Sequence, residues 1–155
     1  MIRAVIDTST LVGQARRRDL QEAAALGLFE AIWSPWIVAE LNRVLTWRAI
    51  ERSGCDLSAA HRNRLSASSK AMMEYLTATF TMVDPKPPHP PPWDDLSDPW
   101  DIPIWAAAKA SGATYVVSEN TDDYPTRQPD GRYVHEGIEY VRGDAFLRLI
   151  TSDLE

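Results

Sequence analysis

Short apolar runs and longer helical stripes alternate along the chain. The short runs are rich in β-branched and aromatic residues and end in polar residues, which is typical of strands. They comprise residues 2–6, 31–33, 79–83 and 114–118. Residues 133–134 and 138–141 are predicted to form a last strand or a hairpin.

The longer stripes predict helices. They cover residues 19–29, 35–47, 58–77, 102–110 and 144–150, and Thr8 to Thr10 can cap a further helical start. Ser34 and Pro35 occupy the preferred N-cap and first positions of the second helix. At 3.6 residues per turn, Glu40 lies about 100° from the middle of that helix's apolar face. Glu40 is therefore expected at the border between core and water.

The alternation of strands and helices predicts the fold class. A mainly parallel central sheet covered on both faces, a three-layer α/β/α sandwich, is the favoured architecture. At 155 residues the chain is expected to form one domain over residues 1–155. Six prolines between Pro85 and Pro92 predict an exposed, extended loop before the acidic region near Asp98.

Net charge and composition exclude some classes of function. The net charge of −6 argues against a protein that coats nucleic acid through many phosphate contacts. Any such binding must be local, assisted by metal or supplied by a partner. The chain has no apolar run of roughly 18 residues, no secretory signal pattern and a single cysteine, so we expect a cytoplasmic protein with no membrane span.

Four acidic stretches carry the candidate chemistry, and two of them follow predicted strands. They are Asp7-Thr8-Ser9, Glu40, Asp98 to Asp101, and Glu119 to Asp123. The carboxyl ends of parallel strands meet at one sheet edge, where ligands bind. Carboxylates gathered there repel one another unless a hard cation lies among them, so a site for Mg²⁺ or Mn²⁺ is the first hypothesis.

Each acid also has a structural interpretation. Asp7 can end a strand as a turn or cap residue, and Glu40 can be an ordinary helix-surface glutamate. Because Pro103 must lie in the first helical turn, Asp101 is expected near the N-cap and Asp98 outside the helix, as a capping or supporting residue. The segment from Asn120 to Asp123 also consists of residue types that are common in turns.

Other chemistries find less support. The histidines lack zinc spacing, and no nucleophile elbow, P-loop or dinucleotide fingerprint is present. Asp7-Thr8-Ser9 is similar to the aspartyl nucleophile of haloacid-dehalogenase-like phosphatases, but these carry a second acid where this chain has Ser9. Trp36, Trp93 and Trp100 are candidates for stacking on nucleic-acid bases.

Taken together, four motifs resemble a PIN domain, the metal-dependent nuclease fold of VapC-type toxins. The motifs are residues 5–9, residues 34–45 with Glu40, residues 98–108 with Asp101, and residues 112–124. The resemblance implies that Asp7, Glu40 and Asp101 are the three core acids. The family's fourth acidic position falls on Asn120, with Asp123 three residues later, and both are candidate metal ligands. Thr8 or Ser9 matches the family's small hydroxyl residue, and Asp98 is a supporting residue.

The resemblance implies a ribonuclease that uses Mg²⁺ or Mn²⁺, with RNA as substrate and single-stranded DNA as an open alternative. It further implies a toxin held inactive by a cognate antitoxin protein, and a homodimer. Two other readings stay open. One is a non-catalytic PIN-like module that binds RNA or protein, favoured by Asn120, and the other is a phosphatase-like hydrolase, disfavoured by Ser9.

Overall fold

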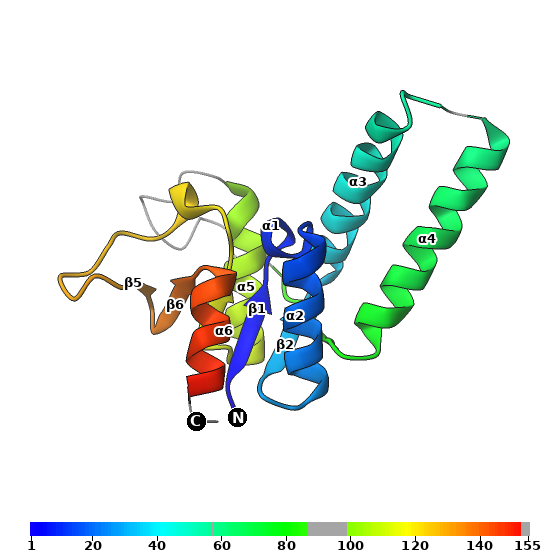
Figure 1. The fold of residues 1–155 in the computed structure, drawn as a ribbon. Helices are drawn as coiled ribbons and strands as arrows, with labels where there is room; N and C mark the ends of the chain where they lie inside the picture. Colours follow the sequence, from blue (N-terminus) through cyan, green and yellow to red (C-terminus); the bar gives the residue numbers. More distant parts are fainter. Residues whose placement is uncertain (57, 87–98, 153–155) are drawn as a thin grey trace.

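The structure is a computed structural model that describes residues 1–56, 58–86 and 99–152. Asp98 and most of the proline-rich segment lie outside these residues. In chain order the elements are β1 (Arg3–Ile6), α1 (Thr8–Leu11), α2 (Gln14–Ala25), β2 (Glu30–Trp33), α3 (Pro35–Arg52), α4 (Ala59–Thr77), β3 (Thr81–Met82), the 3-10 helix η1 (Pro99–Asp101), α5 (Ile102–Ser111), β4 (Tyr115–Val117), the 3-10 helix η2 (Thr121–Asp123), β5 (Tyr133–His135), β6 (Ile138–Val141) and α6 (Gly143–Thr151) (Figure 1).

The sheet has the strand order β3-β2-β1-β4-β6-β5. Neighbouring strands pair in parallel, except that β5 runs antiparallel to β6 as the outer strand of a hairpin. From β1 the chain first adds β2 and β3 on one side, and later adds β4, β6 and β5 on the other. The strand order therefore reverses between β1 and β4, and ligands of open α/β sheets bind outside the strand ends at such a point.

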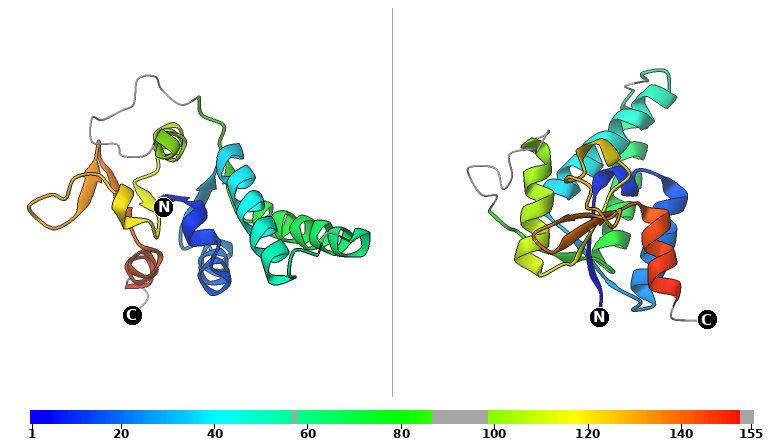
Figure 2. Two further views of the ribbon diagram at one scale, coloured as in Figure 1. Left: turned by 90° about the horizontal axis from the view of Figure 1, so that it is seen from above. Right: turned by 90° about the vertical axis from the view of Figure 1, so that its left-hand side faces the viewer.

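Helices cover both faces of the sheet. Helix α5 packs on one face against β1, β2 and β4, while α2 and α6 lie together on the other (Figure 2). These layers confirm the predicted α/β/α sandwich with a mainly parallel sheet. Helices α3 and α4 form a long hairpin that projects beyond the sheet (Figure 1).

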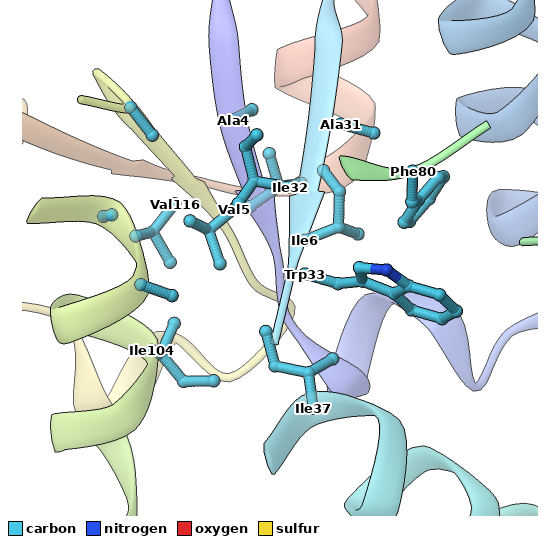
Figure 3. Packing of buried hydrophobic residues seen from close by; sticks show 14 of the residues in the cluster. Ala4, Val5, Ile6, Ala31, Ile32, Trp33, Ile37, Phe80, Ile104 and Val116 are labelled. Atoms are coloured by element: carbon cyan, nitrogen blue, oxygen red, sulfur yellow. The ribbon is translucent and has the colours of Figure 1, made fainter. Parts of the chain in front are cut away.

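The central strands are continuous apolar runs in the sequence because both faces of the sheet are buried. Ala4, Val5 and Ile6 of β1 are all completely buried, because helices cover the sheet on both sides. Val5 pairs in register with Val116 of β4, and Figure 3 shows Ile104 of α5 close to both. These contacts fix the position of α5, whose first turn leads into the candidate site.

Three elements have clearly different bounds from those predicted from the sequence, while several others differ by a single residue at an end. Helix α2 covers Gln14–Ala25 instead of residues 19–29, and Phe29 packs edge-on against Phe146 with ring centroids 5.0 Å apart. Helix α3 continues to Arg52 and does not end near Trp47. Strand β3 has two residues, Thr81–Met82, instead of five, because only β2 pairs with it at the sheet edge.

The predicted helix signals act as expected. The Ser34 hydroxyl accepts a hydrogen bond from the Ile37 amide at 3.4 Å, and Ser58 caps α4 in the same way. Gly112 ends α5 in a left-handed conformation with φ of 66°. Within the described ranges, no helix combines the length and apolar character that crossing a membrane requires.

Candidate functional site

A cleft of about 310 Å³ opens at the carboxyl ends of β1 and β4. Its walls come from four separate segments of the chain, and they contain every site residue predicted from the sequence apart from Asp98, which lies outside the described residues. The lining residues are Asp7, Thr8, Ser9, Val12, Glu40, Val44, Arg48, Trp100, Asp101, Ile104, Asn120 and Asp123.

Asp7 both caps a helix and lines the cleft. Its Oδ1 accepts a hydrogen bond from the Thr8 amide at 2.7 Å, which makes Asp7 the N-cap of α1. Its Oδ2 accepts hydrogen bonds from the hydroxyls of Ser9, at 2.6 Å, and Ser118, at 2.9 Å. The backbone amide of Asp7 donates to the Val117 carbonyl at 2.9 Å, which ties the end of β1 to β4. The carboxylate therefore has a fixed orientation at the strand-order reversal.

The two hydroxyl residues after Asp7 have different surroundings. Besides its bond to Asp7, the Ser9 hydroxyl accepts a hydrogen bond from the Glu119 amide at 2.9 Å. The Thr8 hydroxyl is buried and has no hydrogen-bond partner among the residues that the structure describes. Ser9 therefore positions the Asp7 carboxylate, whereas the Thr8 hydroxyl is a buried donor without a partner in the described part of the chain.

Helix α3 contributes Glu40, Val44 and Arg48, which are spaced by four residues and so lie on one stripe of the helix. Glu40 is partly buried, as its border position predicted. Arg48 was not predicted as a site residue. It is exposed and forms no ion pair with any residue in the described ranges, so it brings a positive charge to a largely acidic cleft.

Asp101 lies at the junction of η1 and α5, next to the wall residue Ile104. It occupies the N-cap position that Pro103 predicted, but its side chain makes no capping hydrogen bond. Its backbone is already helical, with φ of −80° and ψ of −16°, since η1 leads directly into α5. The carboxylate is therefore part of the cleft wall without serving as a helix cap.

The segment after β4 supplies the last side of the cleft. The Asn120 amide donates a hydrogen bond to the Asp123 carboxylate, and both side chains line the cleft. Glu119 instead accepts hydrogen bonds from the Gly143 amide at 3.0 Å and from Arg142 at 3.2 Å. Of this acidic stretch, Asn120 and Asp123 belong to the site, and Glu119 anchors the segment to the start of α6.

Tyr140 of β6 lies beneath the acids, in a small pocket that Asp7 and Asp101 also line. Its hydroxyl is buried and makes no hydrogen bond within the described part of the chain. Burial, and then the negative charges of Asp101 and Asp7, raise the pKa of Tyr140 well above its ordinary value. The hydroxyl therefore stays protonated and can act as a donor, a role that the sequence did not suggest.

The donor set fits a hard divalent cation, because carboxylate, amide and hydroxyl oxygens are the ligands that Mg²⁺ and Mn²⁺ prefer. The carboxylates share the cleft but do not meet at one point. Among the described residues, no three acidic, histidine or cysteine side chains lie close enough to hold one ion together.

Comparison with known protein families matches residues 3–122 to the PIN domain. The match covers most of the chain and includes Asp7, Glu40, Asp101 and Asn120. A search of curated proteins returned no match. PIN domains are generally nucleases, and those nucleases typically use divalent metals. The chain therefore belongs to the PIN-domain family and has a nuclease-like fold.

Proposed function

We propose that this protein is an endoribonuclease that hydrolyses RNA phosphodiesters with Mg²⁺ or Mn²⁺. The observation that supports the proposal best is that Asp7, Glu40 and Asp101 come from three distant segments and line one cleft. Capping of α1 accounts for Asp7, but it does not explain why Glu40 and Asp101 line the same cleft at the strand-order reversal. A metal-assisted reaction accounts for this arrangement.

In this proposal Asp7 and Asp101 bind the metal, and Glu40 completes the site directly or through water. When bound, the metal would lower the pKa of an attacking water and offset the charge that develops on the phosphate. Asn120 offers a carbonyl oxygen but no charge. Asp123, which is hydrogen-bonded to Asn120, supplies a carboxylate on the same side of the cleft.

Arginines in and next to the cleft provide local positive charge for an RNA backbone, although the chain as a whole is acidic. A groove that adjoins the cleft shares Val12 and Arg48 with it and also contains Arg17 and Arg52. Among the described residues, Glu51 is the one acid that lines this groove. Local positive charge of this kind supports binding of a phosphate backbone even though the net charge is −6.

The test is cleavage of an end-labelled single-stranded RNA with Mg²⁺, with Mn²⁺ and with EDTA. We expect cleavage only with metal, and a loss of at least about 100-fold in Asp7→Asn and in Asp101→Asn. The matched control is Asp19→Asn, an exposed acid of α2 that does not line the cleft. Full cleavage by both site variants would refute this assignment.

A second candidate is a PIN-like module that binds RNA without cutting it. Asn120, and the absence of a preformed three-acid cluster among the described residues, favour it. RNA binding that persists while no cleavage occurs with either metal would select this candidate. A phosphatase-like reaction is less well supported, because the residue two places after Asp7 is Ser9, whose hydroxyl donates to Asp7 itself.

The resemblance to VapC-type toxins extends the proposal to a cellular role. The protein would be the toxin of a toxin–antitoxin pair, inhibited by a cognate protein, and would form a homodimer. Arrest of growth on expression, relieved by co-expressing the product of a neighbouring gene, tests the first point. Sedimentation of the purified protein tests the second.

A further inference from the structure

Two tryptophans stack on one another at the mouth of the cleft. Trp36, in the first turn of α3, and Trp100, in η1, have ring centroids 5.1 Å apart and planes inclined by 22°. They remain 37% and 61% exposed, whereas Trp33 and Trp105 belong to the core. We call Trp36 and Trp100 the tryptophan pair.

The tryptophan pair borders a groove of about 520 Å³ that continues into the acidic cleft. Besides the pair, the groove is lined by Ala39, Glu40 and Arg43. Glu40 and Trp100 line both the groove and the cleft. A chain molecule that places a phosphate among the acids would therefore pass the indole rings.

The chemistry of this groove favours an unpaired nucleobase over an apolar protein segment. Its apolar surface is almost entirely the two planar indoles, since its other residues are small or charged. Arg43 is exposed and forms no ion pair with the described residues, so it is available to an anion. Planar rings beside a cation are complementary to a base and its phosphate, and proteins that bind single strands combine these two features.

We propose that the tryptophan pair is a stacking subsite for an unpaired base of the RNA, next to the phosphate that is cut, and that Arg43 contacts a neighbouring phosphate. This inference rests on the proposed ribonuclease function, which it deepens by assigning the residues that bind a base beside the cleft. Bases of a duplex are already stacked on one another and do not present a free face to the indoles. The subsite therefore takes an unpaired base.

Binding without metal tests the subsite separately from cleavage. The probe is a fluorescein-labelled single-stranded RNA about ten nucleotides long, within the site size of single-strand binders, and binding is followed by anisotropy in EDTA. Trp36→Ala and Trp100→Ala are each expected to weaken binding about tenfold, since stacking on an aromatic ring contributes roughly 1–3 kcal/mol per base. The matched control, Trp47→Ala, removes an exposed tryptophan of the same helix that lines neither cavity and should leave binding unchanged.

A double-mutant cycle separates a ring–base contact from a structural effect. RNAs with one abasic position each are titrated against the wild-type protein and against Trp100→Ala. At one position the two losses should not add, because both changes remove the same contact. Trp36→Phe and Trp100→Phe retain a planar ring and should lose less affinity than the alanine variants, which also guards against loss through misfolding.

Three results would overturn the subsite. They are absence of binding by the wild-type chain, affinities of both alanine variants within about twofold of the wild type, and additive losses at every abasic position. The last two would mean that the pair fixes η1 on α3 or contacts a protein. Binding that depends on the tryptophans, without cleavage, would support the subsite and refute the ribonuclease function. Cleavage that is unchanged in both alanine variants would support the ribonuclease function and refute the subsite.

Discussion

The hydroxyls of Ser118 and Ser9 donate to the same oxygen of Asp7. Asp7 follows β1 and Ser118 follows β4, so the orientation of this carboxylate depends on how these two strands pair. Ile6 and Val117 pair in register, and the residues that follow them therefore meet at the sheet edge. In the proposed site, where Asp7 binds the metal, Ser118 would orient a ligand, and loss of such an orienting group commonly lowers metal affinity by about 10- to 100-fold.

Replacing Ser118 with alanine should therefore weaken Mn²⁺ binding or cleavage by about 10- to 100-fold while the protein remains folded. Titration of Mn²⁺ by calorimetry, together with a melting curve, measures both effects. Ser111→Ala is the control, because its hydroxyl donates to a carbonyl within α5, away from the cleft. Equal metal affinity in the two variants would show that Ser118 does not position Asp7 for metal.

Asp101→Asn should change stability in opposite directions with and without metal. Without metal it removes one of several neighbouring negative charges, so the Tm should rise slightly. With Mn²⁺ at about 100 times the Kd, the wild type should gain about 2.7 kcal/mol, or roughly 5–10 °C in Tm, and the variant should gain little. Scanning fluorimetry with Asp19→Asn as control checks this, and an equal Mn²⁺ shift in wild type and Asp101→Asn would contradict it.

Arg48→Ala should raise KM for RNA while kcat changes much less, since the proposed contact is to the phosphate backbone. The slope of log affinity against log salt should fall by about one unit. Arg62→Ala, which removes an exposed charge of α4 outside the cleft, should change neither quantity. An unchanged salt slope in Arg48→Ala would place the RNA path elsewhere.

Tyr140→Phe and Tyr124→Phe should have different effects on the free energy of unfolding. The Tyr124 hydroxyl donates to the Ser118 carbonyl at 2.6 Å, so its removal should lower the free energy of unfolding by about 1 kcal/mol. The Tyr140 hydroxyl has no hydrogen-bond partner in the described structure, so its removal should leave stability equal or about 1 kcal/mol higher. Urea unfolding of the metal-free variants distinguishes them, and comparable destabilisation in both would mean that Tyr140 has a partner after all.

The sequence predicted the fold where local patterns were strong. An apolar run such as Ala4 to Ile6 identifies a strand that is covered on both faces, and Ser34-Pro35 identifies a helix start. Helix ends were less predictable. Beyond Trp47 the apolar periodicity of helix α3 fades, so the sequence pattern gave no sign that the helix continues. The helix nevertheless extends to Arg52, and it packs against α4.

The residues of the candidate site were predictable in part. Asp7, Glu40 and Asp101 were predicted because each lies at a position that the family resemblance marks, and all three line the cleft. Ser118 was missed because the register between β1 and β4, which are far apart in the chain, cannot be read from either segment alone. Arg48 was missed because the predicted helix stopped one residue short of it, although the spacing of Glu40, Val44 and Arg48 was a usable signal.

The anchoring of Glu119 by Arg142 and Gly143 has a consequence for where the functional unit ends. The family match stops at residue 122, yet the segment that carries Asn120 is held by residues 142 and 143 through Glu119. A side chain at position 143 would put its Cβ 2.7 Å from Cδ of Arg16 and 2.9 Å from Oε1 of Glu119, so the Glu119 side chain would have to move from its bond to the Gly143 amide. The start of α6, beyond the matched region, thus supports one wall of the cleft, and a fragment cut at residue 122 would retain Asp7, Glu40, Asp101 and Asn120 but lose the contacts that hold the Asn120 segment.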